Sequence, residues 1–233
     1  MGIRHTVWLA AMFLAILMNP FNAGAQEAEL PGGTAQTTLT PGKATGVLTD
    51  RLKKSHLKAW ESIMKIVLAK DGEGRPLHPA LYELYHQADN SGHEIQIELS
   101  TQRATMCAVG ICRIELHTER VPKEVVLIRL NLGMIDRAIA SAPNRRAGGF
   151  VPFAGLTKKE RYAEVLGHEL AHVVRLLTSP DYSGLYRERQ ALADTGSQDI
   201  QVIGRLTTLI EKPAEAAEAE IWRELTADRE PKM

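Results

Sequence analysis

The pentad His168-Glu169-Leu170-Ala171-His172, of the pattern H-E-x-x-H, carries the clearest chemistry in this chain. On a helix, residues four apart lie one turn apart on the same face, so His168 and His172 can direct their imidazoles at one metal ion. Glu169 projects beside that ion, where a carboxylate can take a proton from water. The pattern predicts a zinc-dependent hydrolase with two histidine ligands and Glu169 as the general base.

The sequence around the pentad predicts a long and largely buried helix. Thr157 and Glu160 form a capping box, so the helix should begin there and run to about Leu177, before Pro180. The apolar residues around the pentad are Val165, Leu166, Leu170, Val173 and Val174. A chance pair of surface histidines is the alternative, but a glutamate in an apolar stretch is costly to bury without a metal or another partner.

A zinc site of this kind needs a third protein ligand. No histidine follows His172, so we expect a downstream carboxylate; the candidates are Glu188, Asp194, Asp199, Glu211, Glu215, Glu218, Glu220 and Glu224. Glu224 is favoured because Asp228 lies one helical turn later on the same face. A ligating histidine usually donates its second ring N–H to a carboxylate, the role predicted for Asp228. The alternative is a solvated acidic helix end.

These two segments resemble a known class of enzymes. H-E-x-x-H followed by E-x-x-x-D on a later helix resembles the gluzincin zinc metallopeptidases, and "GHELAHVV" and "RELTADRE" are similar to their CAAX-endopeptidase-like group. Ala171 departs from the glycine common before the second histidine. The resemblance implies one zinc ion, peptide-bond hydrolysis and a zincin-like fold, in which a small, mostly antiparallel sheet packs on the motif helix. Members of that group often span membranes several times, which this chain is not expected to do.

Two further parts of an active site can be sought in the sequence. Tyr182 and Tyr186, the nearest phenols after the motif helix, are candidates to stabilise the oxyanion, and each can equally be a packing tyrosine. Peptidases commonly hold an extended substrate as an added strand at a sheet edge. A predicted hairpin over residues 94–117 is the candidate edge, with a purely structural role as the alternative.

The first 25 residues have the composition of a signal peptide. A short basic region at Arg4 and His5 precedes an apolar run over residues 7–18, and Ala23-Gly24-Ala25 fits a cleavage site before Gln26. The run is shorter than the ~20 residues of a membrane span, although an uncleaved N-terminal anchor is the alternative. The sequence therefore predicts a periplasmic or secreted protein with no membrane span after cleavage.

The two cysteines of the chain, Cys107 and Cys112, lie close together. In an oxidising compartment two close cysteines usually pair, so we expect a disulfide that stiffens the tip of the predicted hairpin. A zinc site at these thiols is disfavoured, because two thiols alone do not complete a zinc shell.

The periodicity predicts an α+β fold. Residues 26–47 form a flexible leader, and residues 48–230 form one domain. Helices are expected at 48–69, 78–89, 132–142, 157–177, 186–211 and 214–228, and strands around 95–99, 114–116 and 125–131.

The charge balance restricts the partners. Lysine plus arginine and aspartate plus glutamate number 28 each, so the chain has no basic excess for nucleic acid. The expected partner is a peptide or protein substrate, and the sequence predicts no particular oligomeric state. Two other functions stay open: an exported zinc-binding scaffold that hydrolyses nothing, and a zinc amidase that acts on cell-wall bonds.

Overall fold

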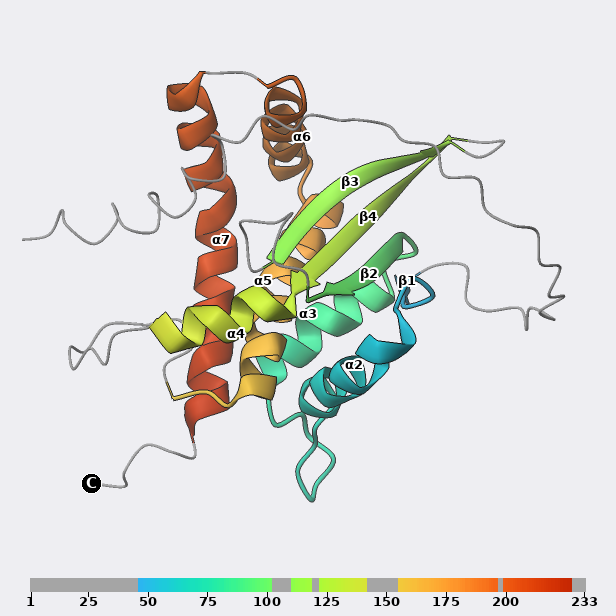
Figure 1. The fold of residues 1–233 in the computed structure, drawn as a ribbon, viewed down its shortest axis with the longest axis vertical. Coiled ribbons are helices and arrows are strands. Elements are labelled where there is room, and N and C mark those ends of the chain that lie inside the picture. The colour runs from blue at the N-terminus through green and yellow to red at the C-terminus, as the bar shows by residue number, and fades with distance from the viewer. Residues whose placement is uncertain (1–45, 102–109, 119–121, 142–154, 197–198, 228–233) are drawn as a thin grey trace, which may run out of the picture. The chain divides into compact units, whose positions relative to one another are not determined.

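Figure 1 shows a computed structural model of the chain, which describes residues 46–101, 110–118, 122–141, 155–196 and 199–227. All of these described residues belong to one compact unit. The predicted signal peptide and almost all of the predicted leader lie outside the described residues. Within the described ranges, no helix is both long enough and apolar enough to cross a lipid bilayer.

The α+β fold contains a four-stranded mixed sheet of order β1-β2-β4-β3 (Figure 1). β1 (Gly46–Leu48), β2 (Glu94–Ser100) and β4 (Pro122–Asn131) are parallel, and β3 (Gly110–Thr118) runs antiparallel to β4. Two expectations are thereby corrected: the sheet is not mostly antiparallel, and β2 and β3 do not form a hairpin, because β4 lies between them. β1 was expected to be part of the leader and of the next helix.

The composition of the strands explains this order. In β4 the side chains of Val125, Val126, Leu127 and Ile128 are all buried, so this strand is apolar on both faces. Such a strand buries most surface in the middle of a sheet. The parallel pair β1 and β2 needs a long crossover, which α2 (Lys54–Val67) and α3 (Pro79–Asp89) supply.

Helix α5 (Lys158–Thr178) lies at the centre of the packing. It contacts α2, α3, α4 (Leu132–Ser141), α6 (Pro180–Asp194), α7 (Ile200–Thr226), β3 and β4. The predicted capping box is confirmed, since the Glu160 N–H donates to Thr157 and the Glu160 side chain accepts from the Thr157 N–H. The helix carrying the pentad therefore begins where the sequence predicted and is held on several sides.

The last two helices differ from the prediction. α6 begins at Pro180, directly after α5, because Ser179 caps its first turn and proline is well suited to that position. α7 runs through Pro213 as one helix, although a break was predicted there. An internal proline costs about 3 kcal/mol, but both halves of α7 have buried residues. The packing of α7 on α5 and α6 offsets that cost.

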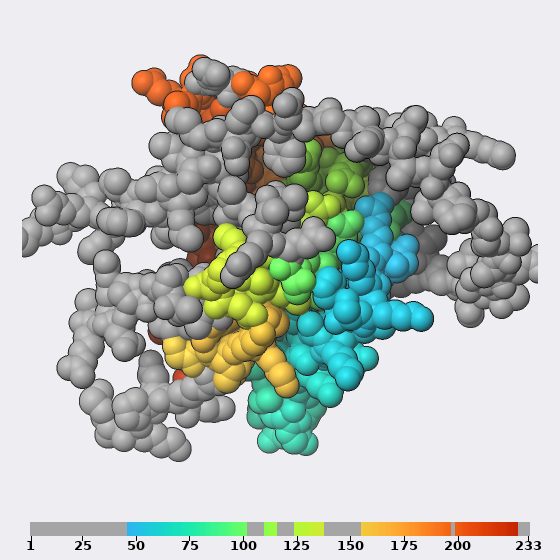
Figure 2. Space-filling view, viewed as in Figure 1, coloured from blue at the N-terminus to red at the C-terminus, as the bar shows by residue number. Residues whose placement is uncertain are grey.

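The core lies between one face of the sheet and the helices. Its fully buried members include Ile95, Ile97, Ile128, Leu166 and Leu170. Figure 2 shows the face on which α2, α4 and the beginning of α5 lie together. Because the middle of α5 is buried in this core, the pentad is held inside the fold.

Candidate metal centre

His168 and His172 stand on one face of α5 and point toward the same place. Their Nε2 atoms are 3.2 Å apart. The His172 side chain is 4% exposed and that of His168 15% exposed. The predicted pairing of the two imidazoles is thus present in the structure, in a nearly buried position.

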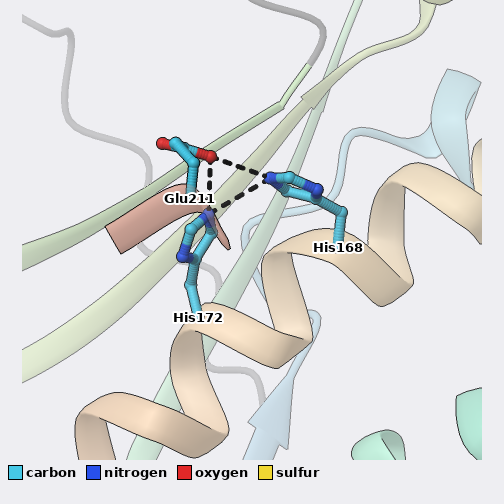
Figure 3. A group of neighbouring side chains, drawn as sticks. All are labelled: His168, His172 and Glu211. Carbon is cyan, nitrogen blue, oxygen red and sulfur yellow. Dashed lines mark hydrogen bonds and ion pairs between the residues drawn. The ribbon is translucent and has the colours of Figure 1, made fainter. Parts of the chain in front are cut away.

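Glu211 from α7 completes a group of three (Figure 3). Its Oε2 atom lies 3.2 Å from His168 Nε2 and 3.3 Å from His172 Nε2. Side chains of two helices pack closely on Gly167 of α5: a Cβ there would lie 3.0 Å from Leu81 and even closer to Ile221 on α7.

The spacing of these three atoms fits zinc. Zinc bonds to imidazole nitrogen and carboxylate oxygen are about 2.0–2.2 Å long, so two ligands of a tetrahedral ion lie about 3.4 Å apart. The three separations between the two Nε2 atoms and Oε2 are 3.2, 3.2 and 3.3 Å. Two histidines and one carboxylate with a fourth position left over form the donor set of catalytic zinc sites.

The charges around the site also favour a cation. Burial would raise the pKa of Glu211, but its hydrogen bonds to His168 and His172 hold that pKa well below the usual range. Burial would likewise lower the pKa of His168, and the bonds to Glu211 and Glu218 outweigh it and raise that pKa. Three nearly buried carboxylates, including Glu169, face two imidazoles, and a divalent ion would balance this excess of negative charge.

The second nitrogen of each ring has its own partner. His168 Nδ1 lies 3.1 Å from Glu218, and His172 Nδ1 lies 2.5 Å from the hydroxyl of Tyr182. The Tyr182 hydroxyl donates to the carbonyl of Ile210 at 3.1 Å, so it accepts from His172. With a metal bound, each Nδ1 would carry the proton toward these partners, and each Nε2 would give its lone pair to the ion in place of its hydrogen bond to Glu211.

Glu169 lies beneath the beginning of β3. Its side chain is buried, and its carboxylate contacts Gly110 so closely that a Cβ at Gly110 would lie 2.9 Å from Cδ. Burial raises the pKa of Glu169, which His168 and His172 counter in part. The predicted base is therefore buried between the two candidate ligands of α5 and is covered by the edge strand β3.

Glu224, the third ligand favoured by the sequence, does not reach the histidines. Its carboxylate accepts from the Ala80 N–H, at 2.9 Å, and thereby caps the N-terminus of α3. It lies 13 residues beyond Glu211, about 20 Å along the axis of α7. Glu211 takes its place in the group of three, and Asp228 lies outside the described residues.

The two candidate oxyanion tyrosines have other partners. Tyr182 lies behind His172, and the hydroxyl of Tyr186 donates to the carbonyl of Cys112 on β3. Both hydroxyls donate to backbone carbonyls, those of Ile210 and Cys112, so a role of either tyrosine in stabilising an oxyanion stays a prediction. The Cys112 thiol is buried and free, so the structure does not contain the predicted disulfide with Cys107, which itself lies outside the described residues.

Sequence reasoning included Glu211 among eight carboxylates but missed what singles it out. Glu211 and Glu218 are seven residues apart, two turns along one face of α7, so they reach the same histidine from the same side. The break predicted at Pro213 divided the pair between two helices. Gly110 carried no sequence signal, because its role depends only on the approach of Glu169.

Comparison with family models, with curated proteins and with solved structures found no match for this chain.

The Tyr182 hydroxyl should control metal affinity. Tyr182→Phe removes the partner of His172 Nδ1, and loss of such a partner typically lowers metal affinity by about 10–100-fold. Tyr186→Phe, one turn later on α6, removes a hydroxyl that bonds only β3 and should leave zinc affinity unchanged. Competition with a chromophoric chelator measures both variants. Equal affinities in the two variants would show that Tyr182 has no special role in holding the site.

Gly110→Ala should impair the base without removing the metal. The new methyl group would meet the Glu169 carboxylate, and a shift of about 1 Å in a reacting group can cost about 100-fold in rate. Gly204→Ala is the control, because that glycine of α7 has open space around its Cα. Turnover and zinc content are measured together; a Gly110→Ala enzyme with wild-type turnover would contradict the placement of Glu169.

Proposed function

We propose that this protein is a zinc-dependent peptidase in which His168, His172 and Glu211 hold the ion. The observation that carries the proposal is the spacing of the three ligand atoms, which agrees with a tetrahedral zinc shell. Glu169, the residue that the H-E-x-x-H pattern assigns as the base, is buried on the same helix between the two histidines. Two histidines and a downstream glutamate form the ligand set of the gluzincin class, to which we assign the chain as part of this proposal.

The residues of the chain have distinct roles in this proposal. When bound, Zn²⁺ supplies Lewis acidity toward water and toward the scissile carbonyl. Glu169 takes a proton from the attacking water and returns it to the leaving amine. Glu218 and Tyr182 hold the two imidazoles in the tautomer and orientation that the ion needs.

The ligand set argues for a catalytic rather than a structural ion. A structural zinc site usually closes its fourth position with a fourth protein side chain. Among the described residues, His168, His172 and Glu211 are the one group of three that could hold a metal ion. A buried glutamate beside an incomplete shell favours hydrolysis over a purely scaffolding role. From the N-terminal sequence we further propose that the enzyme is exported and acts in the periplasm or outside the cell.

Metal analysis combined with a general peptidase assay tests this function. The purified chain should contain one zinc ion and cleave an unfolded protein such as reduced, alkylated casein. A chelator should abolish cleavage, and added zinc should restore it. A chain that holds zinc but cleaves no unfolded protein would instead support a scaffold or an amidase of cell-wall bonds. A chain that binds no zinc would refute the metal site itself.

A further inference from the structure

The outer edge of β3 is partly closed by α6. β3 is the edge strand of the sheet, and the backbone of Ile114 faces outward. The side-chain amide of Gln190 accepts from the Ile114 N–H at 3.0 Å and donates to the Ile114 carbonyl at 2.7 Å, as a neighbouring strand would. Tyr186 takes the carbonyl of Cys112, the previous outward-facing residue. An added peptide strand therefore cannot pair with this stretch of β3.

α6 is held in this position at its beginning and in its middle. At its beginning, the Tyr182 hydroxyl joins His172 on α5 to Ile210 on α7. Further along, Arg187 makes a paired ion bridge to Glu124 at 2.6 and 2.7 Å. Displacing α6 would therefore release the partner of a proposed metal ligand. α6, with Tyr186 and Gln190 bonded to β3, is therefore a fixed wall along this stretch of the edge and not a movable lid.

The reacting bond must lie near the other end of β3. Glu169 contacts Gly110, and side chains alternate along a strand, so the backbone of Gly110 faces outward like that of Cys112 and Ile114. No side chain in the described ranges caps Gly110. From Gly110 to Cys112 the strand rises about 7 Å, which leaves room for about two substrate residues before the wall.

We propose that this wall makes the protein an aminopeptidase-type enzyme, which removes one or two residues from a free N-terminus; the inference rests on the proposed peptidase function. Antiparallel pairing is the commoner and slightly more stable arrangement of strands. In an antiparallel substrate, the residues opposite Cys112 and Ile114 precede the residue opposite Gly110. The wall therefore restricts the N-terminal side of the scissile bond, and Tyr186 at Cys112, followed by Gln190 at Ile114, sets how many residues fit there.

Three peptides of one unstructured 12-residue sequence test the proposal: one with a free N-terminus, one acetylated, and one cyclised head to tail. The zinc-loaded full chain should shorten the free peptide stepwise from its N-terminus and should leave the cyclic peptide intact. The acetylated peptide should be cut at least tenfold more slowly. Mass spectrometry of the products identifies each cut.

The outcomes separate this inference from the proposed function. Opening of the cyclic peptide, or trimming from the C-terminus, would overturn the inference while the peptidase function stands. Failure to cut any peptide or casein would remove both. A double variant, Tyr186→Phe with Gln190→Ala, frees the backbone of Cys112 and Ile114 and keeps Tyr182, so it should also release products of three or four residues. Unchanged product lengths would show that these two side chains do not set the limit.

Discussion

Replacing Glu211 with glutamine should remove most of the bound zinc. Structural zinc sites bind with about 10–16 kcal/mol over four ligands, so one ligand contributes about 2.5–4 kcal/mol, which corresponds to a loss of roughly 10²–10³-fold in affinity. Glutamine keeps the size of the side chain but loses the charge that faces His168 and His172. The zinc content after dialysis and the affinity by chelator competition measure this loss.

Glu224→Gln is the matched control, because it makes the same chemical change on the same helix. Glu224 caps the N-terminus of α3 through Ala80, so its replacement should cost about 1 kcal/mol of folding stability and leave zinc affinity unchanged. The opposite result, with zinc lost in Glu224→Gln and kept in Glu211→Gln, would restore the ligand set favoured by the sequence. Thermal unfolding of both variants separates loss of metal from loss of fold.

The parts of the site that were predictable depend on short-range patterns. The pentad, its capping box and the apolar face of α5 all lie within about 20 residues, and each follows from the geometry of one helix. The strands around Ile97 and Ile128 were predictable for the same reason, from alternation or from a buried apolar run. Local geometry was therefore enough to place His168, His172 and Glu169 together on one buried helix.

The remaining parts depend on packing between distant segments. Pro213 has a strong local preference against a helix interior, and the packing of α7 on α5 overrides it. Because α7 is continuous, Glu211 and Glu218 share one of its faces. Glu224 lies near the C-terminal end of α7, beside α3. The spacing of Glu224 and Asp228 fitted a ligand pair equally well, because spacing along one helix carries no information about which turn faces α5.

The order of the strands in the sheet also depends on packing between distant segments. β2 and β3 each alternate as a hairpin would, and their sequences do not exclude direct pairing. β4 decides the pairing, because a strand that is apolar on both faces buries most surface in the middle of a sheet, with a strand along each edge. This insertion makes β3 an edge strand, places Gly110 over Glu169 and brings the outer edge of β3 against α6.

Glu169→Gln should keep zinc and lose turnover. The amide has nearly the shape of the carboxylate and fits the same buried space beside Gly110, but it cannot accept the proton of the attacking water. Loss of a general base typically costs about 10²–10⁴-fold in rate. Casein cleavage and zinc content are measured on the same preparation, with Glu224→Gln as a variant that loses a carboxylate outside the site.

The comparison between Glu169→Gln and Glu211→Gln then distinguishes the two kinds of role. Activity lost through removal of a ligand should be partly restored by excess zinc in the assay, because mass action refills a weakened site. Activity lost through removal of the base should not be restored by added zinc at any concentration. Recovery of Glu169→Gln turnover by zinc alone would mean that Glu169 supports the metal rather than the proton transfer, and the assignment of the base would then have to move to another group facing the site.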